Sequence, residues 1–418
     1  MFAATNAPRR RCNIFATNVT DNTRPNFHAR ATNSAQSEQG VSAYFPSPVV
    51  TNLSQAAASK RGAERADLRA MFGPEFWMIL GFLLAAYSIV ANDAIQTLGT
   101  FISSNQHRPW WVLWLFASGI LCAVMIYGYA TNHGDVSYGR LAKFPLPENF
   151  SWFYVIPPVV LVFLTRFGFP VSTTFLILTV FRPENLQGML FKSVTGYVVA
   201  FFVGLAVYVI TVRTVEKRFI DTSGAPPRSF WIVLQWGSTA FLWTQWLVQD
   251  LANIFVFLPR QLDWTWFLAA LGVMVALHAV IFYTAGGAIQ KIVTSKTNTT
   301  DIRSATIVDF IYGLILMVFK EWSNMPMSTT WVFLGLLAGR ELAISIVMMR
   351  PPFKHVAKIA GIDLSKAGAG LAASVILALT LPKIFPGDTS GPRVAAAEPP
   401  TPAAQEQENL RADQARRP

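Results

Sequence analysis

Long runs of hydrophobic residues alternate with short polar segments along most of this 418-residue chain. Three examples are WWVLWLFASGILCAVMIYGYA, GYVVAFFVGLAVYVITV and WFLAALGVMVALHAVIFYTA. A helix of about 20 apolar residues is long enough to cross the hydrocarbon core of a bilayer. These runs are apolar on every face rather than along one stripe, which favours membrane-spanning helices over the half-exposed helices of a soluble protein. The pattern therefore predicts an all-α polytopic membrane protein.

The same pattern divides the chain into spans, short pieces and tails. The expected apolar segments lie near residues 74–104, 109–131, 150–167, 189–212, 229–258, 264–288, 304–320, 332–349 and 368–386. Two pieces near 168–181 and 322–331 are too short to cross a bilayer alone. Residues 1–70 and 387–418 are polar and lack apolar periodicity, so each is predicted to be a disordered tail. An organellar targeting segment is the alternative for residues 1–70.

Composition agrees with this organisation and excludes several functions. Hydrophobic residues make up 52% of the chain and charged residues 14%. The two cysteines, Cys12 and Cys122, cannot form a disulfide framework or a metal site. The formal net charge of +11 comes from Lys and Arg in loops between apolar runs, as expected for loops that face anionic lipid. We therefore expect a lipid bilayer as partner and no nucleic acid.

An internal repeat underlies the whole apolar region. The segment IVANDAIQTLGTF precedes GFPVSTTF in the first half, and LVQDLANIFVFLP precedes NMPMSTTW in the second. Asp93 precedes Ser172 by 79 residues, and Asp250 precedes Ser328 by 78. A third element lies between them in each half, YATNHGDVSYGRL and then YTAGGAIQKIV. These landmarks predict two homologous transmembrane units, residues 73–220 and 228–386.

Each unit carries an aspartate next to its first landmark carboxamides within an apolar segment, Asp93 in the first unit and Asp250 in the second. A carboxylate at membrane depth is costly, which makes both candidates for a functional site. Carboxamides flank the two aspartates, namely Asn92, Gln96, Gln249 and Asn253. Carboxylate and amide oxygens suit Na⁺ or a proton better than a transition metal. The alternative is that these residues only join helices by hydrogen bonds, but their duplication favours ion binding.

The two Pro-x-Ser-Thr-Thr sequences indicate helices that break and restart within the membrane. Proline is well placed in a first helical turn, so Pro170 and Pro326 mark such restarts. The first hydroxyl run comprises Ser172, Thr173 and Thr174, and the second comprises Ser328, Thr329 and Thr330. Free N–H groups and the positive dipole end at a helix N-terminus favour an anion, while simple capping of a re-entrant turn is the alternative. An anion beside two aspartates requires cations between them, which predicts cation-coupled anion transport.

The paired motifs resemble those of the PiT family of inorganic phosphate transporters. The sequences ANDAIQTLGT and PVSTT carry the resemblance in the first unit, and QDLAN and PMSTT carry it in the second. The resemblance implies inverted repeats whose broken helices meet at a central site. It also implies symport of inorganic phosphate with Na⁺ or H⁺, and makes a homodimer plausible. It covers both units and neither tail.

The predicted roles are divided between an anion and a coupling ion, without a further cofactor. Anion binding is assigned to Ser172, Thr173, Thr174, Ser328, Thr329, Thr330, Gln96 and Asn253. Coupling-ion binding is assigned to Asp93, Asn92, Asp250 and Gln249, with Asp93 and Asp250 as the Na⁺ candidates. The expected location is a bacterial inner (cell) membrane rather than an organellar one.

Departures from the family pattern leave the substrate open. Phe175 and Trp331 stand where the family has His after each hydroxyl run. Protonated phosphate can donate a hydrogen bond to an aspartate whereas sulfate cannot, which favours phosphate over sulfate. The sequence is also compatible with a non-transporting sensor or a passive anion channel. An enzyme is not expected, because no nucleophile–base pair, metal cluster or nucleotide loop is recognisable.

The sequence also leaves the orientation of the two halves open. Lys and Arg cluster around residues 60–69, 140–143, 213–228, 291–303 and 350–366. If all these loops were cytoplasmic, simple alternation of spans would make the halves parallel. The family resemblance implies inverted halves instead, which requires an odd number of crossings in each unit. The side on which the C-terminus lies is therefore not fixed by the sequence.

Overall fold

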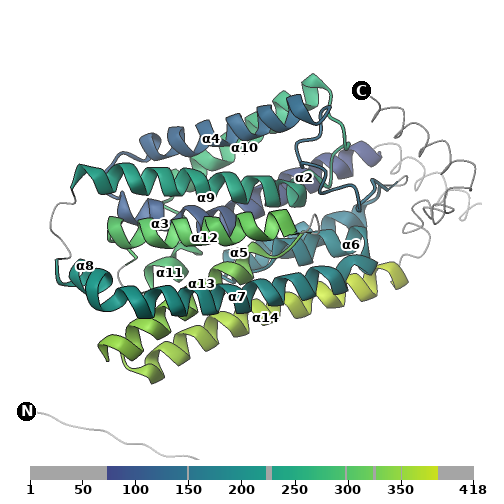
Figure 1. Cartoon of the computed structure of the whole chain (residues 1–418). Helices are drawn as coiled ribbons and strands as arrows, with labels where there is room; N and C mark the ends of the chain where they lie inside the picture. The colour runs from purple at the N-terminus through teal and green to yellow at the C-terminus, as the bar shows by residue number, and fades with distance from the viewer. Residues whose placement is uncertain are drawn as a thin grey trace, which may run out of the picture. The chain divides into compact units, whose positions relative to one another are not determined.

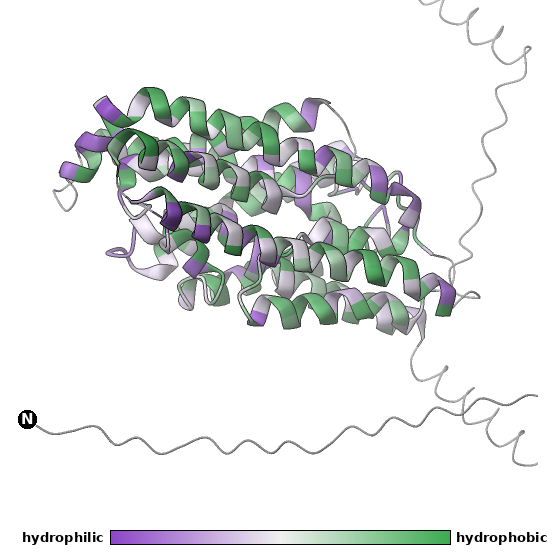
Figure 2. Ribbon diagram, turned by 90° about the horizontal axis from the view of Figure 1, so that it is seen from below, coloured by the Kyte–Doolittle hydropathy of each residue, from purple (hydrophilic) through white to green (hydrophobic). Residues whose placement is uncertain are grey.

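A computed structural model describes residues 73–147, 150–222, 228–296, 299–322, 326–349 and 351–384. The tails predicted at 1–70 and 387–418 lie outside the described residues. Within these ranges the secondary structure is entirely helical, and seven helices are long and apolar enough to cross a membrane. Figure 2 shows hydrophobic residues along the helices and hydrophilic residues gathered towards their ends. The prediction of an all-α polytopic membrane protein is confirmed.

The first half contains long and short α-helices joined by π-helical and 3₁₀ turns. Its helices are α2 (Pro74–Ile89), α3 (Ile95–Ser104), α4 (Trp110–Thr131), α5 (Ile156–Arg166), α6 (Thr179–Phe181), α7 (Leu186–Thr211) and α8 (Lys217–Asp221). Its π-helical turns are η1 (Val90–Ala94), η3 (Thr174–Leu178) and η5 (Val212–Glu216), and its 3₁₀ turns are η2 (Trp152–Val155) and η4 (Pro183–Asn185). The second half contains α9 (Ser229–Phe255), α10 (Trp264–Tyr283), α11 (Gln290–Thr294), α12 (Ile302–Trp322), α13 (Thr329–Met348) and α14 (Phe353–Ile384).

Several boundaries differ from the sequence-based expectation. Thr329 begins α13, so the piece expected at 322–331 does not stand apart from the span expected at 332–349. The α14 helix starts at Phe353, well before the expected residue 368, and includes much of the predicted basic loop. Two expected spans, α5 and α9, are not among the seven. The first is short, and α9 carries several buried polar side chains, such as Gln249 and Asp250.

Helices of one half pack mainly on helices of the other. In Figure 1, α7 runs alongside α13, and α4 lies with α10 on one face. The last long helix of the first half, α7, packs on α13, which carries the second hydroxyl run. Reciprocally, the last helix of the second half, α14, packs on η3 and α6, which follow the first hydroxyl run. Two related halves that exchange equivalent contacts would pack in this way, although their homology stays a prediction.

The two halves run in opposite directions through the bundle. Figure 1 shows the start of α2 and the end of α14 at one end, with α8 at the other. Arg303 of α12 donates to Thr222 next to α8. Lys143, by contrast, lies at the end opposite α8, where its carbonyl oxygen accepts from Arg182. Residues 140–143 and the basic segments near α8 therefore lie at opposite ends of the bundle, so the condition under which simple alternation would make the halves parallel is not met.

Glycines allow α7 and α13 to approach closely. Gly335 and Gly339 on α13 are spaced four residues apart, as in membrane helices that pack through small residues. A Cβ atom at Gly335 would fall against the backbone of Tyr197 on α7, and one at Gly339 against the backbone of Phe201. On the α7 side, a Cβ at Gly204 would lie 2.7 Å from the carbonyl oxygen of Leu336. The interface therefore has no room for larger residues.

Replacing Gly335 by Ala is expected to destabilise the protein, because the added methyl group must push two backbones apart. Overpacking of this kind costs about 1–3 kcal/mol. The expected result is a lower melting temperature of the purified protein in detergent. Gly119→Ala is the matched control, since nothing lies within 4 Å of a Cβ at that position of α4. Equal melting temperatures for the two variants would contradict the proposed packing.

Candidate functional site

The structure brings both copies of both motifs together in the interior. All twelve residues predicted to bind an anion or a coupling ion are buried, and Asp93 and Asp250 are 2% and 1% exposed. Asp93 lies in the π-helical turn η1, whereas Asp250 lies in the regular helix α9. Turns of the π type within a helix often mark functional sites. We call the two aspartates and the two hydroxyl runs the central site.

Asp93 is bound to the first hydroxyl run of its own half. Its Oδ2 atom accepts a hydrogen bond from Thr173 Oγ1 at 2.5 Å. Its Oδ1 atom accepts from Asn92 Nδ2 at 2.8 Å. The same amide nitrogen donates to the carbonyl oxygen of Val171 at 2.6 Å. The acidic motif and the hydroxyl run, 79 residues apart in sequence, thus form one hydrogen-bonded unit.

Asn253 joins the acidic motif of the second half to the hydroxyl run of the first. Its Nδ2 atom donates to Asp250 Oδ1 at 2.7 Å, to Thr173 Oγ1 at 3.1 Å and to Thr174 Oγ1 at 3.2 Å. Thr174 Oγ1 in turn donates to the carbonyl oxygen of Met327, just before the second hydroxyl run. The four motifs therefore meet in a single network.

The two hydroxyl runs begin helices of very different length. Ser328 caps α13, a helix of 20 residues, and its Oγ atom accepts from the N–H of Trp331 at 3.3 Å. Ser172 Oγ accepts from the N–H of Phe175 at 3.3 Å, but only the short elements η3 and α6 follow. Capping is thus present at both serines. The N–H of Ser328 also donates to Ser193 Oγ of α7 at 2.8 Å.

Several buried oxygen atoms of the acidic motifs have no hydrogen-bond donor among the described residues. They are Gln96 Oε1, Gln249 Oε1, Asp250 Oδ2 and Asn253 Oδ1. Carboxylate and carbonyl oxygens are the ligands that hard cations prefer. No group of three or more His, Cys, Asp or Glu that could hold a metal ion is found in the described part of the chain. The atoms at this site therefore fit Na⁺ or a proton rather than a transition metal.

Another buried carboxylate, Asp309 on α12, was not predicted. Its Oδ1 atom accepts from Thr100 Oγ1 at 2.5 Å, and its Oδ2 atom accepts from Thr239 Oγ1 at 2.6 Å. These contacts join α12 to α3 and α9. The only sequence signal is its place within an apolar run, because Asp309 belongs to neither repeated motif. Both of its oxygens are satisfied, which is the arrangement of a structural link between helices.

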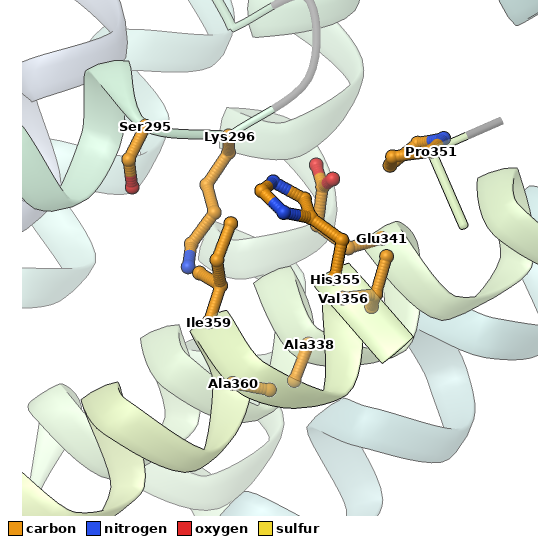
Figure 3. Close-up of a pocket in the computed structure, with 9 residues that line it drawn as sticks. All are labelled: Ser295, Lys296, Ala338, Glu341, Pro351, His355, Val356, Ile359 and Ala360. Atoms are coloured by element: carbon orange, nitrogen blue, oxygen red, sulfur yellow. The ribbon is translucent and has the colours of Figure 1, made fainter. Parts of the chain in front are cut away.

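A second polar region lies near α8 and is separate from the central site. Arg340 is fully buried and binds Glu216 at 2.8 Å and Glu341 at 2.9 Å. Figure 3 shows an adjoining cavity of about 170 Å³, towards which Lys296 and His355 extend. The cavity is lined by Ser295, Lys296, Ala338, Glu341, Pro351, His355, Val356, Ile359 and Ala360, and no predicted site residue is among them. Lys296 is paired with Asp363 at 2.5 Å.

The comparisons with known proteins show one distant likeness. No protein-family model matches the chain, and no curated protein matches its sequence. A solved structure described as "The sodium-dependent phosphate transporter" is similar to 74% of this chain and 99% of that one. The two share 17% sequence identity, with a TM-score of 0.47. The chain itself is a multi-pass helical membrane protein with a buried polar centre.

Replacing Asn253 by Leu is expected to destabilise the central site. The change removes the donor to Asp250 Oδ1 and leaves a buried carboxylate without that partner. Losing one partner of a buried hydrogen bond costs about 1–3 kcal/mol. Thermal melting of the purified variant measures the effect, with Gln187→Leu at an exposed amide of α7 as control. A melting temperature equal to that of the control would show that the Asn253 contacts contribute little.

Proposed function

We propose that this protein is a secondary active transporter that carries inorganic phosphate across a membrane by symport with Na⁺ or H⁺. The observation that carries the proposal is the convergence of two buried aspartates and two hydroxyl runs on one network. Ionisable groups within membrane helices are expensive and typically mark an ion or substrate pathway. The paired motifs that resemble the PiT family support phosphate as the substrate.

The hydroxyl groups are suited to an oxyanion. They offer donors at two helix starts without placing a fixed positive charge there. Thr173 is the most informative, because its only hydroxyl proton is donated to Asp93. A hydroxyl has a single O–H donor. If the Thr173 hydroxyl donated its hydrogen bond to a bound anion instead, Asp93 Oδ2 would lose its donor.

This change of acceptor at Thr173 would couple anion binding to cation binding. A carboxylate that loses its donor in a buried site must gain a cation or a proton. Asp250 Oδ2 already has no donor among the described residues. Anion binding at Thr173 therefore favours cation binding at Asp93, while Asn92, Gln249 and Asp250 complete the proposed coupling site. The side-chain atoms of Gln96 and Asn253 that have no hydrogen-bond partner are oxygens. We therefore infer that both residues also contribute to cation binding, in addition to the anion binding assigned to them.

Movement of one half against the other would expose the central site to alternate sides of the membrane. Sulfate transport on the same scaffold is the second candidate, because hydroxyl donors serve either anion. Phosphate is favoured, since its protonated form can donate a hydrogen bond to Asp250 Oδ2. The proposed location is a bacterial inner membrane, and the protein is proposed to form a homodimer there.

Phosphate uptake into proteoliposomes tests this function. Uptake of radiolabelled phosphate is measured under a Na⁺ gradient, a pH gradient or no gradient, with sulfate as competitor. Gradient-dependent uptake is expected, and Asp93→Asn and Asp250→Asn are each expected to reduce it to the level of protein-free liposomes. Asp221→Asn is the control, because Asp221 is exposed at the end of α8.

Different outcomes would distinguish the competing functions. Transport of sulfate without phosphate would retain the transporter and overturn the substrate. Phosphate uptake that needs no gradient and survives both aspartate substitutions would indicate a channel. Absence of transport for both anions, from folded protein, would favour a sensor.

A further inference from the structure

The repeated element YATNHGDVSYGRL has no part in the function proposed above, yet it buries an arginine. Arg140 is 3% exposed, and its Nη1 group finds no hydrogen-bond acceptor among the described residues. Removing a charged group from water costs several kcal/mol unless a partner compensates. Buried polar groups are nearly always paired, so an unpaired one requires an explanation. We refer to residues 132–144, which contain it, as the Arg140 loop.

The Arg140 loop is held in one conformation by its own side chains. Asp135 Oδ1 accepts from the N–H of Ser137 at 2.7 Å, and Asp135 Oδ2 accepts from the N–H of Gly139 at 2.8 Å. Tyr138 has a φ of 55°, a region that a residue with a side chain rarely adopts. Its hydroxyl donates to the carbonyl oxygen of Val124 at 2.6 Å. Unusual backbone conformations that surrounding contacts enforce occur often at functional sites.

Contacts with the second half fix where the loop lies. The carbonyl oxygen of Gly134 accepts from the N–H of Leu262 at 3.1 Å. A Cβ atom at Gly134 would be 2.8 Å from the Leu262 carbonyl oxygen, so a larger residue does not fit. Arg260 donates to the carbonyl oxygen of Phe144 at 3.0 Å and 2.7 Å. The loop is thus clamped to the connection between α9 and α10, at the end opposite α8.

The charges around Arg140 place it between the central site and the surface. Its guanidinium interacts electrostatically with Asp250, in the central site, and with Glu321 near the end of α12. The side chain of Glu321 is 72% exposed. Burial lowers the pKa of Arg140, and both carboxylates oppose that shift. Arg140 also acts on Lys192 of α7, which precedes the serine that accepts from Ser328. Positive charge therefore gathers at this end of the central site.

We propose that Arg140 binds the transported oxyanion at the end of the central site opposite α8. A guanidinium presents a planar fork of N–H donors that matches two oxygens of phosphate. An anion there would satisfy the Nη1 group and offset the cost of burying the charge. Because the guanidinium interacts electrostatically with Asp250, the anion would lie within electrostatic reach of the proposed coupling ion. This inference rests on the proposed function and adds a specificity-determining residue to it.

Uptake kinetics in proteoliposomes test the inference. Arg140→Gln is expected to raise the KM for phosphate about tenfold or more, since one charged hydrogen bond contributes about 1.5–3 kcal/mol. The maximal rate should change less than the KM. Arg140→Lys should recover part of the affinity, because an ammonium keeps the charge but not the fork. Lys143→Gln is the control at an exposed cation of the same loop, with a KM close to that of the unchanged protein.

A second measurement separates anion binding from a structural role. Without phosphate, Arg140→Gln should melt at the same temperature as the unchanged protein or above it, because the variant no longer buries an unmatched charge. Added phosphate should raise the melting temperature of the unchanged protein and not that of the variant. A lower melting temperature with an unchanged KM would overturn the inference.

The inference and the proposed function can fail separately. If the unchanged protein carries phosphate and Arg140→Gln keeps its KM, only the role of Arg140 is wrong. If the protein carries sulfate instead, the same KM comparison with sulfate tests Arg140 while the phosphate assignment fails. If it carries neither, the absence of an anion-dependent rise in melting temperature in the unchanged protein would overturn both.

Discussion

A carboxylate buried among membrane helices needs donors or cations, and Asp93 and Asp250 impose this requirement on the centre of the protein. Asp93 receives hydrogen bonds from Thr173 and Asn92, and Asp250 receives one from Asn253. These contacts position the start of η3 beside η1 and bring α9 against the first hydroxyl run. The geometry of the central site therefore follows from stabilising two charges where water does not reach them.

Close packing of α7 on α13 brings the second hydroxyl run to the same place. Gly335 and Gly339 let the two backbones approach, so that Ser193 of α7 can accept from the N–H of Ser328. The start of α13 is thereby held next to the first hydroxyl run, where Thr174 donates to the Met327 carbonyl oxygen. The packing of α7 on α13 thus sets the position of the second hydroxyl run relative to the first.

The parts of this arrangement that could be predicted from the sequence are the motifs that occur twice in the chain. Asp93, Asp250 and the hydroxyl runs were predicted because each occurs twice in the same order, and the structure brings them together. Asp309 has no such counterpart, and its role depends on Thr100 and Thr239, which only the fold brings near. The sequence left the side on which residues 140–143 lie open, because charge alone does not reveal which segments are re-entrant. The start of α13 at Thr329 was also missed, because a separate short piece was expected at 322–331. Apolar residues follow the hydroxyl run without a break, so the sequence does not mark where the helix begins.

Hydrogen bonds at the central site lie both within each half and between the halves. Those to Asp93 and Asp250 come from Thr173, Asn92 and Asn253, each in the same half as the carboxylate it serves. Some bonds that cross between the halves join neutral groups, for example Thr174 with the Met327 carbonyl and Thr330 with the Val171 carbonyl, whereas others are charged, such as that of Arg340 with Glu216. Charged hydrogen bonds are about twice as strong as neutral ones. The bonds that Asp93 and Asp250 receive within their own halves are therefore stronger than the neutral bonds that join the halves at the central site, so each carboxylate is held first of all by its own half.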